Sequence, residues 1–298
     1  MDEELLLFDR LNVIKDTINK YGEDKFYVSF SGGKDSTVVH HLVDMALPNN
    51  KIPRVFSNTG IEYIYIYNFV KEMARGDSRF EIIQPRLNIK KMLEEDGYPI
   101  KSKEHSVKLD LWQRGSTARS VIDYINGEGR QNKLYACPKK LRYQFTPEFT
   151  LKVSDKCCLR MKKEPFKDYE RRTGRHIGIT GIQSSEGGAR ASIDSCITFK
   201  DGKVRRFHPL IKVDEEWEDW FIQKFNIRLC DLYYPPFNFK RTGCKGCPYS
   251  LRLQEDLDTM EMYLPEERKQ CEIIWKPVYD EYRRIGYRLN DYYQEKLF

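Results

Sequence analysis

The feature of this sequence that most constrains its fold is an alternation of short β-prone runs with segments of helical periodicity. Residues 25–30 and 54–57 are apolar runs, and each is followed by a segment whose apolar residues recur at helical spacing. The pattern returns at residues 80–84 and 176–180. Because parallel strands are joined by helical crossovers, this order of elements is typical of a parallel sheet. We therefore predict an α/β fold.

Helices and an insert complete the predicted layout. The polar and basic stretch at residues 100–149 interrupts the alternation, so we interpret it as an insert over the sheet. Residues 1–240 are predicted to form the main domain, with this insert near 100–150. Residues 241–298 are predicted to form a segment of C-terminal helices that packs on that domain. The predicted helices elsewhere span residues 5–20, 37–46, 61–74, 89–96 and 214–225.

Composition and charge exclude few classes of function. The chain has 298 residues, of which 40% are hydrophobic, and its formal net charge is +6. No apolar run reaches the roughly 18 residues of a membrane span, and the N-terminus lacks a signal-peptide pattern. We therefore expect a cytoplasmic protein without membrane contact. A basic cluster at Lys139, Lys140 and Arg142 is interpreted as a solvated face, with nucleic-acid binding as the alternative.

The sequence VSFSGGKDST at residues 28–37 places a glycine-rich turn between a predicted strand and a predicted helix. Glycines let backbone N–H groups converge, and a helix N-terminus adds partial positive charge, so the arrangement is typical of a phosphate site. Lys34 supplies a full positive charge, and Asp35 either holds Mg²⁺ or caps the helix. The spacing matches neither the Walker A loop nor the dinucleotide fingerprint. The candidate phosphate-binding residues are Ser29, Ser31, Gly32, Gly33, Lys34, Asp35 and Ser36.

The motif S-G-G-K-D-S at residues 31–36 resembles the PP-loop of the ATP pyrophosphatases, the adenine nucleotide α-hydrolase superfamily. The resemblance implies a Rossmann-like parallel sheet with helices on both faces. It also implies an enzyme that grips ATP with Mg²⁺ and cleaves it between the α and β phosphates, usually by adenylating a substrate. The sequence VFSNTGIEY at residues 55–63 resembles the family's adenine- and ribose-binding loop, which implies that role for Asn58, Thr59 and Gly60.

A third segment, TGIQSSEGGAR at residues 180–190, follows a predicted strand and resembles another segment of this family. Gly181 would allow close approach to the nucleotide. Arg190 would neutralise a phosphate oxygen, and Glu186 would orient Arg190 or a magnesium ion. Lys34, Asp35 and Arg190 are thus the predicted catalytic residues.

Eight cysteines stand in a sequence expected to be cytoplasmic, where disulfides are rare. Cys157 and Cys158 are adjacent, and Cys244 and Cys247 form a C-x2-C pair. The two pairs are therefore candidates for one metal centre with four thiolates, which suits zinc or an iron–sulfur cluster. The adjacent pair is geometrically awkward for structural zinc, and this favours the cluster.

The cysteine pairs, the HPL sequence at residues 208–210 and a tryptophan-bearing acidic helix together resemble the adenylyl-sulfate and phosphoadenylyl-sulfate (PAPS) reductase family. In the cluster-bearing branch of that family, the resemblance implies a 4Fe–4S cluster. The implied ligands are Cys157, Cys158, Cys244 and Cys247. Cys271 is a reserve ligand, and Cys137 is a weaker candidate.

Two departures separate this chain from the sulfonucleotide reductases. Their loop is degraded, whereas S-G-G-K-D-S is intact here, which implies that ATP itself is bound. Their nucleophilic cysteine lies in a C-terminal tail, whereas this sequence ends NDYYQEKLF. An intact loop with four cysteines also resembles the ATP pyrophosphatases of DNA phosphorothioation and the cluster-dependent tRNA thiolation enzymes.

We therefore predict a PAPS reductase-like PP-loop enzyme that adenylates a target and works in sulfur transfer with an iron–sulfur cluster. Its expected partners are an adenine nucleotide, a sulfur donor such as a cysteine desulfurase, and a nucleic-acid substrate. The alternatives are a phosphoadenylyl-sulfate or adenylyl-sulfate reductase and, from another class, a nucleotide-sensing nucleic-acid-binding protein.

Overall fold

The chain divides into two compact units, which are described separately. This computed structural model describes residues 2–127, 136–184 and 192–290. The first unit comprises Met1–Asn58, Glu62–Gln84 and Glu164–Gly243, and the second comprises Thr59–Ile61, Pro85–Lys163 and Cys244–Phe298. The predicted boundary after residue 240 lies near the last of these transitions. The predicted insert, however, groups with the C-terminal stretch and not with the main domain.

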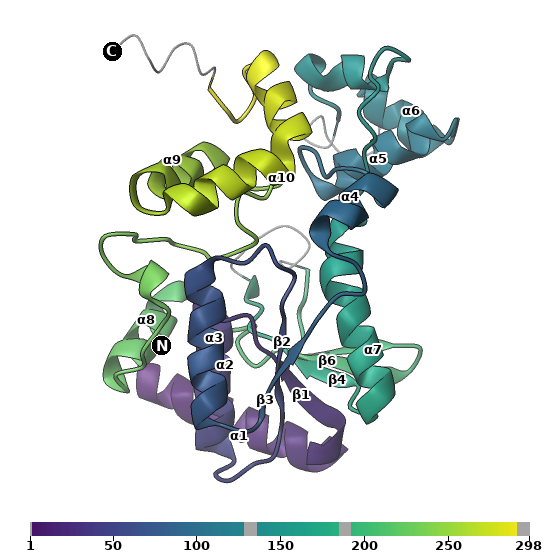
Figure 1. Cartoon of the computed structure of the whole chain (residues 1–298). Coiled ribbons are helices and arrows are strands. Elements are labelled where there is room, and N and C mark those ends of the chain that lie inside the picture. The colour runs from purple at the N-terminus through teal and green to yellow at the C-terminus, as the bar shows by residue number, and fades with distance from the viewer. Residues whose placement is uncertain (1, 128–135, 185–191, 291–298) are drawn as a thin grey trace. The chain divides into compact units, whose positions relative to one another are not determined.

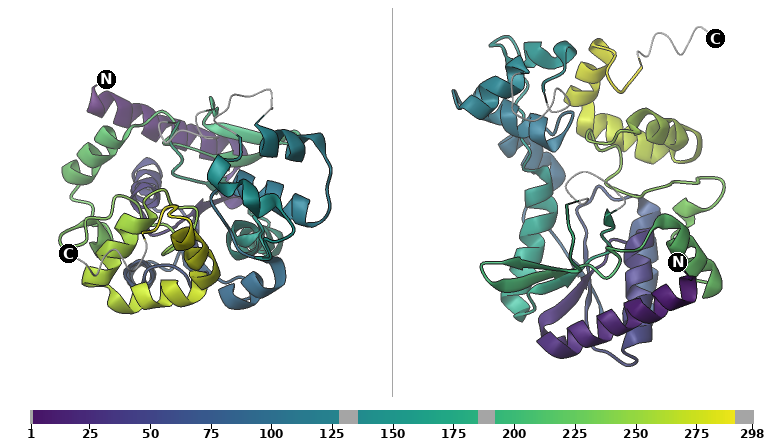
Figure 2. Two further views of the ribbon diagram at one scale, coloured as in Figure 1. Left: turned by 90° about the horizontal axis from the view of Figure 1, so that it is seen from above. Right: turned by 180° about the vertical axis from the view of Figure 1, so that it is seen from behind.

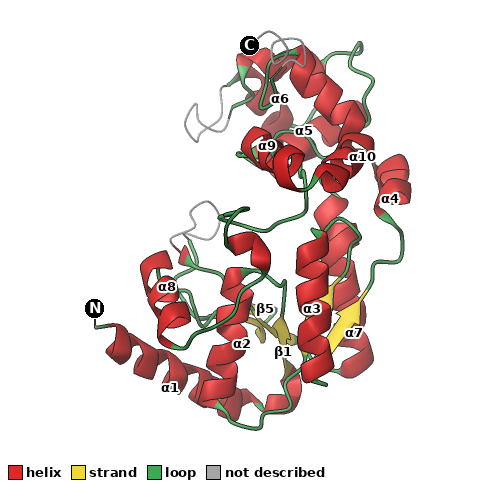
Figure 3. Ribbon diagram, turned by 60° about the vertical axis from the view of Figure 1, so that its left-hand side comes forward, coloured by secondary structure: helices red, strands yellow, loops and turns green. Residues whose placement is uncertain are grey.

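The first unit is built on a six-stranded sheet with the order β3-β2-β1-β4-β6-β5 among the described residues. Figure 3 shows strands of this sheet in yellow and the helices in red. Neighbouring strands are parallel except β5 and β6, which are antiparallel. The predicted α/β fold with a parallel sheet is confirmed. The strands are β1 (Phe26–Ser29), β2 (Arg54–Ser57), β3 (Phe80–Ile83), β4 (Ile177–Ile179), β5 (Ile197–Lys200) and β6 (Lys203–Phe207).

Helices cover both faces of this sheet (Figure 1), and the short strand β1 contributes side chains to the core on each face. Phe26 and Val28 belong to a core that α1, α2 and α8 cover. Tyr27 packs instead against Tyr169 of α7. Successive side chains of a strand point to opposite faces, so each face receives its own apolar residues. The helices of this unit are α1 (Glu3–Tyr21), α2 (Lys34–Ala46), α3 (Ile64–Gly76), α7 (Glu164–Thr173) and α8 (Glu215–Lys224).

The hairpin of β5 and β6 was not predicted, although the sequence holds a signal for it. Asp201 and Gly202 join the two strands with φ angles of 52° and 72°. A two-residue turn with both φ angles positive favours an Asp-Gly pair, because such a turn matches the twist of the flanking strands. Strand β6 is rich in basic residues, so its alternation of apolar and polar side chains is too weak to predict a strand.

The second unit is helical among its described residues. Helices α9 and α10 pack side by side near the C-terminus, which confirms the predicted helical C-terminal segment (Figure 2). No helix within residues 2–127, 136–184 and 192–290 is long and apolar enough to cross a membrane. The α-helices of this unit are α4 (Ile89–Asp96), α5 (Lys103–Gln113), α6 (Arg119–Asn126), α9 (Leu253–Tyr263) and α10 (Pro265–Arg284).

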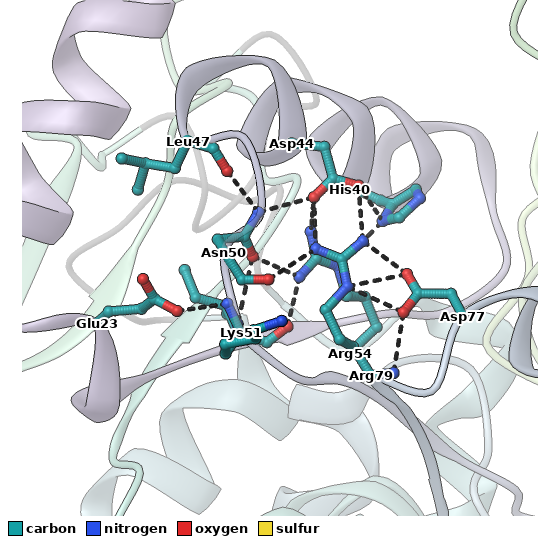
Figure 4. A network of polar contacts seen from close by, with 10 residues as sticks. Glu23, His40, Asp44, Leu47, Asn50, Lys51, Arg54, Asp77 and Arg79 are labelled. Carbon is teal, nitrogen blue, oxygen red and sulfur yellow. Dashed lines mark hydrogen bonds and ion pairs between the residues drawn. The ribbon is translucent and has the colours of Figure 1, made fainter.

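A buried ionic network fixes the amino end of β2 in the first unit (Figure 4). Arg54 is fully buried; its Nη2 donates to Asp44 Oδ1 of α2 over 2.7 Å, and its Nε donates to His40 Nδ1 over 3.0 Å. Arg79 also ion-pairs with Asp44, over 2.7 Å. Ligand atoms of His40, Asp44 and Asp77 lie within 4.8 Å of one another, but two guanidinium groups already occupy this place. We therefore interpret the network as structural.

Candidate functional site

The glycine-rich loop connects β1 to α2 at the carboxyl edge of the sheet, where ligands of open α/β sheets bind. Gly32 has a φ of 74°, and a Cβ atom there would lie 2.9 Å from Ile66 of α3. Glycine is therefore required at this point for both its conformation and its size. Ser29 ends β1 in register with Val55 of β2, so the loop starts beside the neighbouring strand.

Hydroxyl oxygens accept hydrogen bonds from the amides of this loop. Ser31 N donates to Ser36 Oγ over 3.1 Å, and Gly33 N donates to Ser31 Oγ over 3.3 Å. Lys34 N, the first amide of α2, donates to Tyr233 Oη over 2.9 Å. Converging amides with oxygen acceptors are the arrangement that a phosphate site uses, with serine and tyrosine hydroxyls in the acceptor positions here.

The side chain of Lys34 is held by acidic residues of α8. Lys34 Nζ lies 3.0 Å from Glu215 Oε1, 3.2 Å from Asp219 Oδ1 and 4.0 Å from Glu218 Oε2. Burial lowers the pKa of Lys34, but the hydrogen bonds to Glu215 and Asp219 raise it overall, so the ammonium stays charged. The predicted phosphate-binding charge is therefore present at the loop, where it pairs with Glu215 and Asp219.

Glu218 is the least expected member of this group. Its side chain is 1% exposed, and neither carboxyl oxygen has a hydrogen-bond partner among the described residues. Burial and the charge of Asp35 raise its pKa to about 8, although Lys34 and the nearby Gln183 act to lower it. A carboxyl group with this pKa is mostly protonated at neutral pH, so Glu218 adds little negative charge beside the loop.

Gly181 lies directly against the start of α2. A Cβ atom on Gly181 would be 2.7 Å from Asp35 Cβ and 2.9 Å from the Asp35 carbonyl oxygen. The loops after β1 and β4, which are paired strands, therefore meet at the first turn of α2. This close approach requires glycine at position 181.

Substitution of Gly181 by alanine is expected to lower the free energy of unfolding by about 1–3 kcal/mol, because the methyl group must displace the backbone of Asp35. Gly76→Ala in α3 is the control: a Cβ there meets nothing within 4 Å, and helix propensity favours alanine. Urea unfolding followed by circular dichroism measures both. Equal stability of the two variants would contradict the close approach of Gly181 to α2.

The predicted adenine-binding residues follow β2. Asn58 N donates to Ile83 O over 2.9 Å, so Asn58 still continues the sheet. Thr59 and Gly60 group with the second unit; Thr59 is buried, and Gly60 has a φ of 79° with nothing within 4 Å of an added Cβ. Arg190 and Glu186 lie outside the described residues. Their predicted roles stay predictions.

The four predicted metal ligands all lie in the second unit, but they are not among the described residues whose ligand atoms lie within 4.8 Å of one another, so their role stays a prediction. Burial raises the pKa of the Cys157 thiol, and the other three cysteines raise it further. Burial likewise raises the pKa of Cys247 to about 12, with contributions from Cys244 and Cys158. Lys162 acts on both thiols in the opposite direction. The two pairs, far apart in sequence, are thus near enough for the charge of one cysteine to act on another, and Lys162 favours their thiolate forms.

Helix α10 supports the turn that carries the C-x2-C pair. Trp275 Nε1 donates to Lys245 O over 3.2 Å, Tyr279 Oη donates to Gly246 O, and Tyr282 Oη donates to Pro248 O over 2.9 Å. These three side chains are fully buried, at positions i, i+4 and i+7 of one helix face. Sequence patterning predicts the face but not the hydrogen bonds.

The reserve cysteines differ in position. Cys271 packs against the C-x2-C turn. A Cβ atom added to Gly246 in this turn would lie only 2.8 Å from the sulfur of Cys271. Burial raises its pKa to about 12, and the groups that act on it are Lys245, Glu267 and Arg268, not cysteines. Burial raises the pKa of Cys137 to about 11, and its sulfur contacts Pro138 O. Neither residue shares in the thiol group of Cys157.

His208, the first residue of the HPL sequence, is a packed histidine. It is buried, its Nδ1 lies 2.7 Å from Thr180 Oγ1, and burial lowers its pKa to about 4. Sequence analysis overlooked Tyr233 and Glu218, which contact the loop from distant positions. The sequence around each of these two residues does not indicate that its side chain contacts the glycine-rich loop.

Comparison with known proteins gives one family match. Residues 25–122, about a third of the chain, match the family described as phosphoadenosine phosphosulfate reductase domain. Among curated proteins, none matches this sequence. The match covers the loop at residues 31–36 and the segment at residues 58–60, and it leaves the cysteine pairs outside.

Solved structures show only distant likeness. A phosphoadenylyl-sulfate reductase from Candida auris is 14% identical, with 78% of this chain and 93% of that chain covered and a TM-score of 0.43. The NH3-dependent NAD synthetase of Campylobacter jejuni is 12% identical, with coverages of 97% and 99% and a TM-score of 0.41. The U34-tRNA thiolase NcsA of Methanococcus maripaludis, solved with its 4Fe–4S cluster, is 15% identical, with coverages of 95% and 80% and a TM-score of 0.40. Such distant likeness assigns no residue a role.

Proposed function

We propose that this chain, whose residues 25–122 are of the phosphoadenosine phosphosulfate reductase type, is an enzyme that binds ATP and cleaves it between the α and β phosphates. The observation that carries the proposal is the glycine-rich loop. Its amides from Ser31, Gly33 and Lys34 each donate to a hydroxyl oxygen that a phosphate oxygen could replace, and Lys34 adds a positive charge beside them. The motif at residues 31–36 is intact, which favours a nucleotide with a β,γ-pyrophosphate.

In the proposed reaction, an oxygen of the target attacks the α phosphorus of ATP, the bond to the β-phosphate oxygen breaks, and pyrophosphate leaves. The loop amides would hold the departing pyrophosphate, and Lys34 would neutralise charge on it. Gly181 would keep the loop after β4 close to α2, and Asn58, Thr59 and Gly60 would hold the adenosine. A bound magnesium ion would add charge neutralisation, with Asp35 as its predicted ligand.

The cysteines of the second unit support sulfur transfer as the purpose of this activation. Four cysteines of one unit whose charges act on one another would suit an iron–sulfur cluster or zinc. A cluster there would supply sulfur or electrons to the activated target. The nature of that target, nucleic acid or another molecule, and of the sulfur donor remains part of the proposal. The resemblance to the phosphorothioation and tRNA thiolation enzymes stays a prediction.

Removal of the loop charge should weaken nucleotide binding. Lys34→Ala is expected to lower ATP affinity about ten- to a hundredfold, because a charge-assisted contact contributes roughly 1.5–3 kcal/mol. Lys15→Ala, an exposed lysine of α1, is the matched control. Isothermal titration calorimetry with Mg²⁺ and ATP measures both. Equal affinities for wild type and Lys34→Ala would refute the loop as the phosphate site.

The family description itself favours sulfonucleotide reduction as a second candidate. Two assays separate the candidates: pyrophosphate release from ATP with tRNA, DNA or sulfate added, and thioredoxin-dependent sulfite release from adenylyl sulfate or its 3′-phosphorylated form. We expect the first activity and tighter binding of ATP than of either sulfonucleotide. Sulfite release without pyrophosphate release would establish the reductase instead.

A further inference from the structure

A pocket of about 520 Å³ lies in the second unit and shares no residue with the proposed nucleotide site. The end of α5 contributes Trp112 to it, and residues 146–152 contribute Phe149 and Lys152. Lys152 is the one charged residue among those that line the pocket, all of which the structure describes. The pocket is thus a mainly apolar hollow with two aromatic rings and one cation.

Neighbouring rings hold the two aromatic side chains in place. Trp112 packs edge-on against the buried Phe145, with ring centroids 6.3 Å apart. Phe149 packs edge-on against Tyr143, with ring centroids 5.9 Å apart. Trp112 and Phe149 themselves are only half-buried, so part of each ring stays accessible. Fixed and accessible rings suit a flat aromatic ligand, because stacked and edge-on ring contacts are favourable.

Hydrogen bonds join the two parts of the chain that form the pocket. Gln113 Nε2 donates to Leu151 O over 2.8 Å, and Val153 N donates to Gln113 Oε1 over 3.1 Å. The end of α5 is thereby tied to the segment that carries Lys152, whose ammonium donates to Glu95 O of α4. The pocket therefore exists before a ligand arrives, and binding does not have to order its walls.

Positive charge is concentrated in the part of the second unit that holds this pocket. Residues 100–127 and 136–163 hold thirteen lysines and arginines and five acidic residues, an excess larger than the +6 of the whole chain. The 3₁₀ helix Lys139–Phe145 runs directly into the pocket segment. Because such a helix rises about 2 Å per residue, Arg142 and Lys139 lie roughly 8 Å and 14 Å along it from Thr146. The exposed cations here that form no ion pair among the described residues are Lys139, Lys140, Arg142 and Lys152.

The rings and the cations together select among the ligands that an apolar pocket could take. A proline-rich peptide would use the rings but leave the cations unused. A nucleic-acid duplex would use the cations, but its bases are stacked on one another inside the helix. A single strand uses both, since its bases stack on aromatic side chains while its phosphates meet lysine and arginine.

We propose that this pocket binds an unpaired base of a single-stranded nucleic acid, stacked on Trp112 and Phe149. Lys152 and the cations of the 3₁₀ helix would neutralise the phosphates on either side of that base. The inference names the substrate class of the enzyme, and in that respect it rests on the proposed function. Binding itself can be measured without ATP.

Fluorescence anisotropy of a labelled single-stranded oligonucleotide tests the pocket in the full-length protein. The oligonucleotide is supplied as RNA, as DNA and as a duplex, and we expect either single strand to bind more tightly than the duplex. Trp112→Ala is expected to weaken single-strand binding about five- to a hundredfold, as the loss of one base–aromatic stack does. Trp112→Phe keeps a ring and should keep most of the affinity. Tyr263→Ala, which removes an exposed ring of α9, is the matched control.

The salt dependence of binding tests the cations separately. Each phosphate contact on a single strand contributes about 0.7 to the slope of log affinity against log salt concentration. The combined substitutions Lys139→Gln, Lys140→Gln and Arg142→Gln should therefore reduce this slope by about 2. Trp112→Ala should weaken binding and leave the slope unchanged, a result that a misfolded protein would not give. Circular dichroism checks that the variants fold.

The outcomes separate this inference from the proposed function. Equal affinity of wild type and Trp112→Ala for single strands, or equal binding of single strands and duplex, overturns the pocket. Binding of a proline-rich peptide without any oligonucleotide binding also overturns it. Single-strand binding that depends on Trp112, in a protein that neither binds nor cleaves ATP, supports the pocket and refutes the proposed function. ATP cleavage by a protein that binds no oligonucleotide refutes the pocket and leaves the proposed function standing.

Discussion

Protein purified without oxygen from a Cys247→Ser variant is expected to contain almost none of the iron of the wild type. Cys247 is a predicted ligand on which Cys244 and Cys158 act electrostatically, and a serine hydroxyl is a poor ligand for iron that thiolates bind well. The wild type should be brown, with iron and acid-labile sulfide in similar amounts. Metal analysis, sulfide analysis and the visible spectrum measure the loss.

Cys137→Ser is the control for this experiment, because Cys137 is buried in the same unit but stands apart from the thiol group. It should keep the wild-type iron content. Cys271→Ser tests the reserve ligand, and we expect it also to keep the iron. Colourless wild-type protein with stoichiometric zinc would mean that the metal is zinc. Wild-type protein without either metal would contradict the metal centre altogether.

The second large effect concerns stability. Asp44→Asn is expected to lower the free energy of unfolding by about 3 kcal/mol, because it leaves the fully buried guanidinium of Arg54 beside Arg79 without their shared counter-charge. Urea unfolding at pH 7 measures the change. The control is Asp280→Asn, which removes an exposed ion pair with Lys276 and should cost no more than about 0.5 kcal/mol. A similar small cost for both variants would contradict the structural role of the network.

The same network predicts a dependence on acid. Burial raises the pKa of Asp44, but hydrogen bonds from Arg79 and the charge of Arg54 lower it overall, to about 2. A carboxyl group whose folded pKa is depressed stabilises the fold above its unfolded pKa, and loses that contribution as the pH falls through the folded value. The difference in stability between wild type and Asp44→Asn should therefore shrink between about pH 4 and pH 2.

The sequence was sufficient to predict the parallel sheet and the position of the loop, for reasons that lie in the local pattern. Each of β1 to β4 is apolar and is bounded by polar turns, and helices such as α4 show strong periodicity. The prediction of residues 89–96 as a helix coincides with the observed α4. Strand β6 was not predicted because three of its five residues are basic, namely Lys203, Arg205 and Arg206.

Pairing of distant side chains was predictable only where the chemistry of the residues required a partner. Two cysteine pairs in an expected reducing environment favour a common metal, so the sequence predicts that Cys157 and Cys244 lie near each other, and Cys244 is one of the groups whose charges act on Cys157. A tyrosine or a glutamate carries no such requirement. Tyr233 and Glu218 meet the loop through the packing of α8 and the turn after it, which periodicity cannot place.

The order in which the chain is made bears on the thiol group. Cys157 and Cys158 leave the ribosome long before Cys244 and Cys247, and the later pair sits on a turn whose carbonyl groups are held by Trp275, Tyr279 and Tyr282. Domains fold from the N-terminal end during synthesis, so the earlier pair must wait for its partners and for α10. Any metal that these thiols hold is therefore acquired by a nearly complete chain. A polypeptide that ends before α10 would contain every residue of the first unit. It would still lack the side chains of α10 that hold the turn with Cys244 and Cys247.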